Sequence, residues 1–181
     1  VTLKTGVSTE VLRVNWGTIE TVGDHSKFVE TCATTFLNAS KIVRTNASSE
    51  NHFRFFCEKL AASVSRELRA TLLRVKKFSM VGCQQALLDA NAIKSQLLEI
   101  PLVVSGGSGG SSSASSSNAT NSARSFRRTV EREFSRIDAM LKCVLNPEDS
   151  IAESLRAMDP KATRSEFTRI CEARGMRKAD I

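Results

Sequence analysis

The chain has 181 residues, enough to bury one good core or two small cores joined by a linker. Apolar residues make up 41% of it and charged residues 25%, which are ordinary values for a globular domain. With three prolines, one tryptophan and no tyrosine, the sequence lacks the aromatic and turn signals of an all-β protein. We therefore expect an all-α fold.

The formal net charge of +7 at pH 7 favours acidic partners, such as nucleic acid, anionic lipid or an acidic protein surface. The excess is shared evenly, because residues 1–104 hold thirteen Lys/Arg against nine Asp/Glu and the rest holds thirteen against ten. A dedicated nucleic-acid-binding arm would concentrate the excess positive charge in one part of the chain. We therefore expect a mildly basic helical surface and no nucleic-acid partner. No apolar run approaches the roughly 20 residues that span a bilayer, and no signal peptide is visible.

Five cysteines are spread along the chain without a C-x-x-C pair. An odd number at wide spacing argues against a disulfide framework and against a zinc site. Each cysteine also lies beside apolar positions of a helical pattern, where free Cys behaves as a small hydrophobe. We interpret Cys32, Cys57, Cys83, Cys143 and Cys171 as packing residues in a reducing, cytosolic compartment.

Apolar residues recur at steps of three and four on both sides of a Ser/Gly-rich tract, and this spacing predicts helices. Before the tract we expect helices over about 24–45, 50–78 and 79–100, preceded by a mostly irregular segment 1–23. Ser79 is expected to cap the third helix and Pro101 to end it. The outer face of the second helix is expected to carry Arg54, Lys59, Arg66, Arg69 and Lys76.

The tract 105–125 is a low-complexity linker with nothing to bury. It divides the chain into an N-terminal helical block, 1–104, and a C-terminal helical block, 126–181. In the second block we expect helices over about 124–145, 147–158 and 163–174. Asn146-Pro147 is typical of a helix start, Thr163 and Glu166 fit a capping box, and Gly175 is placed as a C-cap. The sequence thus predicts six helices in an antiparallel bundle.

The stretch 79–101 is the most distinctive part of the chain. At 100° per residue, Gln85, Asp89, Gln96 and Glu99 share one narrow polar strip, and most other positions are apolar. A helix that is apolar around most of its girth packs on two sides, so we expect a central helix. The pattern leaves open whether the strip contacts another helix of this chain or another protein.

Enzyme chemistry finds little support. His25 and His52 lie near predicted helix starts without a motif around them, and His52 and Cys57 face different sides of one helix. The glycines of the tract 105–125 lack the strand and Lys of a phosphate-binding loop. We expect no catalytic residue, no cofactor and no metal. A cysteine-dependent enzyme is the weakest hypothesis, and it requires a reactive thiol of low pKa.

One side of the predicted helix 124–145 is basic, which offers a surface for the phosphates of lipid or RNA. Its members are Arg124, Arg128, Arg132 and Arg136. Glu131, Glu133 and Asp138 interrupt this arginine stripe, and their spacing suits a solvated helix face. A basic helical module that binds anionic lipid or RNA is therefore the alternative function rather than the first.

The stretch 79–101 also carries a family signature, Gly82-x-x-Gln85-x-Leu87-Leu88-Asp89, then Ile93-Lys94, then Leu97-Leu98-Glu99-Ile100-Pro101. It resembles the C-terminal region of the vacuolar protein sorting-associated protein 53 family. Weaker matches keep the same order upstream and downstream, from Trp16 and Glu20-x-Val22-Gly23-Asp24 to Met140-Leu141-Lys142 and Phe167-x-x-Ile170.

The resemblance implies a stacked helical rod of the kind shared by multisubunit tethering complexes, without catalytic activity. The family's complex is the Golgi-associated retrograde protein (GARP) complex, which captures endosome-derived vesicles at the trans-Golgi network. Implied partners are other subunits of the tethering complex, SNARE proteins and vesicle components, on the cytosolic face of trans-Golgi network and endosome membranes. A weak contact with anionic lipid is also considered. The candidate partner contacts are Gln85, Asp89, Gln96, Arg174, Arg177 and Lys178.

Overall fold

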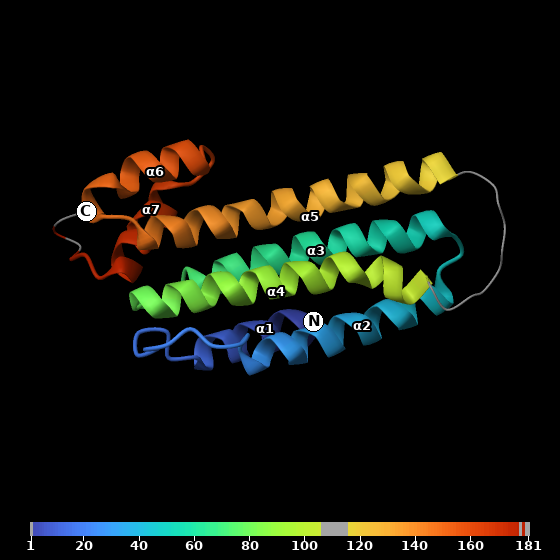
Figure 1. Cartoon of the computed structure of the whole chain (residues 1–181), viewed down its shortest axis with the longest axis horizontal. Helices are drawn as coiled ribbons and strands as arrows, with labels where there is room; N and C mark the ends of the chain where they lie inside the picture. Colours follow the sequence, from blue (N-terminus) through green and yellow to red (C-terminus); the bar gives the residue numbers. More distant parts are fainter. Residues whose placement is uncertain (1, 106–115, 178, 180–181) are drawn as a thin grey trace.

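The computed structural model describes residues 2–105, 116–177 and 179, and all regular structure in them is helical. The elements are α1 Thr2–Arg13, α2 Lys27–Asn46, α3 Glu50–Leu72, α4 Met80–Ser105, α5 Ser116–Leu145, the 3-10 turn η1 Glu148–Ser150, α6 Ile151–Met158 and α7 Arg164–Arg174. Figure 1 shows α2 to α5 side by side along the long axis, with α6 and α7 at the end where α5 finishes. The predicted all-α antiparallel bundle is confirmed.

The helix α4 lies in the middle of the bundle. It packs against α2 on one side and α5 on another, while α3 also contacts α5 (Figure 1). Ile93 and Leu97 in its apolar surface are almost completely buried. The prediction that this helix packs on two sides is confirmed.

One hydrophobic core joins the helices on both sides of the tract 105–125. Its largest fully buried side chains include Phe36, Phe53 and Phe134, from α2, α3 and α5. All five cysteines are free and buried, as expected for packing residues. No described helix combines the length and the apolar character needed to cross a membrane.

The first segment is not irregular as predicted, because residues 2–13 form α1. Its β-branched residues lower the intrinsic helix propensity. Tertiary packing outweighs that preference: Val7 and Val11, one turn apart, are buried in the core. Ser8 adds polar contacts to α3, with its hydroxyl 3.0 Å from that of Thr71.

One predicted boundary of each of α3, α4 and α5 is wrong. α4 continues to Ser105 through Pro101, although a proline inside a helix removes one hydrogen bond and its ring crowds the carbonyl four residues back. α5 begins at Ser116 inside the predicted linker, since extending a formed helix costs little even in a polar sequence. α3 ends at Leu72 because Phe78 and Ser79 donate their backbone N–H groups to Ala173 and Trp16 instead.

The end of the chain follows its capping signals more closely. Thr163 and Glu166 form the predicted capping box of α7, and Gly175 ends the helix at φ 107°. The preceding helix starts later than expected, because Pro147 is extended and one 3-10 turn intervenes before α6. Asn146 is not the N-cap of that helix, and its side-chain amide instead donates to the Ser154 hydroxyl at 2.8 Å.

The start of α4 lies unusually close to the loop after α1. Ser79 caps α4 as predicted, accepting from Gly82 N–H at 2.8 Å, and its hydroxyl also lies 2.9 Å from the Ile19 carbonyl. A Cβ added at Gly82 would overlap the Trp16 carbonyl. The Trp16 ring packs against Phe78 at 5.8 Å between ring centroids, so this loop cannot move away freely.

Gly82→Ala should therefore destabilise the bundle by about 1–3 kcal/mol, because a methyl group must displace backbone atoms. Gly23→Ala is the matched control, since a Cβ there meets nothing within 4 Å. Thermal unfolding followed by circular dichroism measures both. Equal melting temperatures for the two variants would contradict the close approach of α4 to Trp16.

Candidate functional site

Two of the predicted partner contacts, Gln85 and Asp89, are buried, with 5% and 2% of their surface exposed. Gln85 accepts from Gly23 N–H at 3.1 Å and donates to the Asp24 carbonyl at 2.9 Å. Asp89 accepts from the N–H and the hydroxyl of Ser26 at 2.8 and 2.7 Å. These two predicted contacts are therefore made within the chain, because both side chains bind the segment that leads into α2.

The contact of Gln85 and Asp89 with the segment before α2 has a structural role, which the helical projection of the sequence could not show. Ser26 is the N-cap residue of α2, but its side chain makes no capping hydrogen bond. The Asp89 carboxylate places negative charge there instead, where a helix N-terminus favours it. Gln85 also donates to Asp89 at 3.1 Å, which orients the pair. The polar strip of α4 therefore fixes the entry into α2.

The other predicted contacts remain at or near the surface. Gln96 is half-buried, and its Oε1 has no hydrogen-bond partner among the described residues. Arg174 is half-buried and donates from Nη1 to Met80 Sδ at 3.0 Å, which ties α7 to the start of α4. Arg177 is exposed, and Lys178 lies outside the described residues. Gln96 and Arg177 stay candidate contacts.

A partly buried ion cluster that the sequence does not predict joins α3, α5 and the α6–α7 segment. Arg69 donates to Glu166 and, at 3.3 Å, to Asp159. Arg136 donates from Nε to Asp159 at 2.9 Å and lies 3.8 Å from Glu166. Arg69 is only 9% exposed and Asp159 only 5%, so these charges are largely removed from water. We call Arg69, Arg136, Asp159 and Glu166 the ion cluster.

The ion cluster corrects two sequence interpretations. Arg69 does not lie on a solvated face of its helix, and Arg136 does not extend the arginine stripe, because both point to carboxylates of the α6–α7 segment. Sequence periodicity marks polar positions but cannot say which of them meet an opposite charge far along the chain. The one local sequence feature that points to a member of the ion cluster is the capping box, which holds Glu166 in place.

Glu166 titrates abnormally because of this environment. Burial alone would raise the pKa of its carboxyl, but hydrogen bonds from Arg69 and the Thr163 N–H, and the charges of Arg69 and Arg136, outweigh burial. The pKa of Glu166 falls from an ordinary 4.5 to about 2. A lowered carboxyl pKa stabilises the folded state at pH values above 4.5, and that contribution is lost as the pH falls toward 2.

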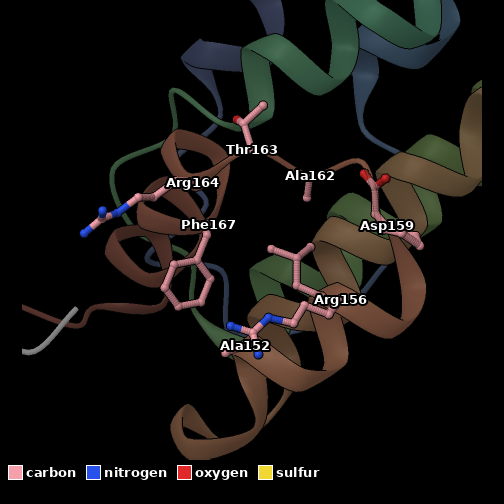
Figure 2. A pocket seen from close by; sticks show the side chains of 9 residues that line it. Ala152, Arg156, Asp159, Ala162, Thr163, Arg164 and Phe167 are labelled. Atoms are coloured by element: carbon pink, nitrogen blue, oxygen red, sulfur yellow. The ribbon is translucent and has the colours of Figure 1, made fainter.

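A pocket lies beside the ion cluster, between α6 and α7 (Figure 2). We call it the α6–α7 pocket; it has a volume of about 320 Å³ and is lined by Ala152, Leu155, Arg156, Asp159, Pro160, Ala162, Thr163, Arg164 and Phe167. Leu155 is buried and Phe167 is half-buried, so the floor is apolar. Arg156 and Arg164 are exposed at its edge, on either side of the Phe167 ring in Figure 2.

The cysteines are poorly suited to nucleophilic chemistry. Burial raises the pKa of Cys57 and Cys83 to about 12 and that of Cys32 and Cys143 to about 11, and it also raises the pKa of Cys171. A reactive cysteine needs the opposite shift, because the thiolate is the nucleophile. His52 contacts the Ser48 hydroxyl at 3.0 Å. Among the described residues no group of His, Cys, Asp and Glu could hold a metal ion.

Glu166→Gln should lower the free energy of unfolding at pH 7 by about 1–3 kcal/mol, because Gln keeps the shape but loses the charge that faces Arg69. The variant should also lose less stability than the parent between pH 4.5 and pH 2. Urea unfolding across this pH range measures both effects. The control is Glu131→Gln, whose exposed pair with Arg127 should contribute under about 1 kcal/mol. Parallel pH curves for Glu166→Gln and the parent would contradict the assignment.

Comparison with known proteins agrees with the resemblance carried by residues 79–101. Residues 84–157 match the family model described as Vacuolar protein sorting-associated protein 53 C-terminus. The chain is 40% identical over 187 residues to Vacuolar protein sorting-associated protein 53 A of Arabidopsis thaliana, covering 99% of this chain and 21% of the relative. It is 25% identical over 174 residues to the Vacuolar protein sorting-associated protein 53 homolog of Caenorhabditis elegans, covering 94% and 20%.

No solved structure matches the chain. The chain spans about a fifth of the length of these curated relatives. The family model covers the sequence from the first turns of α4 to the end of α6, and the aligned relatives extend the match over nearly the whole chain. The chain therefore belongs to the vacuolar protein sorting-associated protein 53 family, in its C-terminal region.

Proposed function

We propose that this chain is the C-terminal region of a non-catalytic subunit of a vesicle-tethering complex. The complex acts in retrograde transport from endosomes to the trans-Golgi network, and this region works through protein–protein contacts on the cytosolic face of those membranes. The observation that carries the proposal is the 40% identity to Vacuolar protein sorting-associated protein 53 A over 99% of the chain, together with the match of residues 84–157 to the family's C-terminal model. Its partners are other subunits of the complex, SNARE proteins and vesicle components.

The use of polar groups in the fold supports a binding role. Gln85 and Asp89 hold the entry into α2, and the ion cluster holds α6 and α7 against the long helices. The thiols are buried with raised pKa values. The groups that a reaction would need are thus engaged in folding contacts, and surface side chains are left to recognise partners.

The alternative function is a basic module for anionic lipid or RNA. Fewer arginines are available for it than the four of the predicted arginine stripe. Arg136 belongs to the ion cluster, and Arg132 lies 3.3 Å from Glu133. This leaves Arg124 and Arg128 as the exposed stripe residues for which the described part of the chain shows no ion pair. Stable membrane recruitment by charge alone uses clusters of about 4–8 basic residues, so the stripe is weak for this purpose.

Affinity purification tests the proposal. The whole protein that carries this chain is tagged in its own cells, and proteins that purify with it are identified by mass spectrometry. We expect other tethering-complex subunits to be recovered at near-stoichiometric amounts, and recovery of none of them would overturn the proposal. Sedimentation of the 181-residue chain with anionic vesicles tests the alternative. Steeply salt-dependent binding that Arg124→Glu/Arg128→Glu removes would favour the lipid module instead.

A further inference from the structure

Three residues that line the α6–α7 pocket are held in place by contacts with their surroundings. Asp159 in its wall is held by Arg69 and Arg136, and Thr163 is held by the capping box with Glu166. Phe167 packs against the hydrophobic core from its half-buried position. A site held in shape by its surroundings loses little conformational freedom when a ligand enters, which favours binding.

The charge that the pocket offers to a ligand is positive. Its single carboxylate, Asp159, is already engaged, since Oδ2 accepts from both arginines of the ion cluster and Oδ1 accepts from Lys161 N–H. Arg156 and Arg164 at the edge are exposed, and no ion pair is described for either of them in residues 2–105, 116–177 and 179. An apolar floor with free guanidinium groups at its edge complements an apolar side chain flanked by carboxylates.

We propose that the α6–α7 pocket docks a short acidic peptide segment of a partner protein. The segment inserts one bulky apolar side chain over Leu155 and Phe167 and places carboxylates against Arg156 and Arg164. This inference deepens the proposed function and rests on it, because it states the partner chemistry that the C-terminal end of the chain recognises.

The composition of the pocket favours a peptide over a phosphate-bearing membrane surface. A lipid headgroup would use the two arginines but would leave the apolar floor without a partner. A volume of about 320 Å³ is close to the lower limit of small-ligand sites and suits a single large side chain with its neighbours. A contact of this size gives weak binding, with a Kd in the micromolar range.

Selection from a random-sequence peptide library against the immobilised 181-residue chain tests this proposal. We expect enriched peptides to place Asp or Glu beside Leu, Ile or Phe, and to bind with micromolar Kd by fluorescence polarisation. Arg156→Glu/Arg164→Glu should weaken binding of the selected peptides by at least about tenfold. The matched control, Arg124→Glu/Arg128→Glu, makes the same change of net charge on α5 and should stay within about twofold of the parent.

Changes in the peptide give a second readout that does not depend on the folding of a protein variant. Replacing the apolar residue of the selected peptide with Gly should weaken binding by about tenfold or more. The proposal is overturned if no peptide is enriched, or if both arginine variants weaken binding equally. It is also overturned if phosphoinositide vesicles bind through Arg156 and Arg164 while the peptide does not compete.

Failure of the docking proposal can be told apart from failure of the tethering proposal. The tethering proposal is tested on the unsubstituted whole protein and the docking proposal on the 181-residue chain, so the two readouts are independent. Recovery of the subunits with no peptide binding would contradict the docking site alone. Loss of the subunits from the parent protein itself would contradict the proposed function.

Discussion

Two arginines and two carboxylates, of which Arg69 and Asp159 are buried, meet where α3 and α5 contact the α6–α7 segment and tie the C-terminal end of the molecule to the long helices. Moving such charges out of water is costly, and the cost is recovered only when every charge has well-placed partners. Here each arginine lies within ion-pair distance of both carboxylates, although Arg69 Nε is left without a hydrogen bond among the described residues. This arrangement acts together with the buried side chains Ile151, Leu155 and Ile170 to place α6 and α7 on the long helices.

A second set of contacts that stabilises the fold comes from the central helix α4, through residues of the family signature. Gly82 permits the close approach of α4 to Trp16, and Gln85 with Asp89 holds the segment that enters α2. Arg174 connects α7 back to α4 through Met80. The most distinctive stretch of the sequence therefore organises the fold through Gly82, Gln85 and Asp89.

Helical periodicity was sufficient to predict α2, α3, α4 and most of α5, because each buries a continuous apolar face. Local capping chemistry predicted both ends of α7. α1 could not be predicted, since its β-branched residues disfavour a helix until Val7 and Val11 are packed in the core. The ion cluster could not be predicted from the sequence either, because Arg69 pairs with Asp159, which lies 90 residues further along the chain. For the same reason, helical projection placed Gln85 and Asp89 on one strip of α4 but could not show that the loop before α2 covers them.

The central claim is that the ion cluster holds α6 and α7 against the long helices α3 and α5. Hydrogen–deuterium exchange of the 181-residue chain carrying Arg69→Met tests it most directly, with the exposed Arg66→Met on the same helix as the control. The account predicts faster exchange in residues 151–174 of Arg69→Met only, with α2 to α4 still protected. Unchanged exchange in residues 151–174, or an equal loss of protection in every helix, would contradict it.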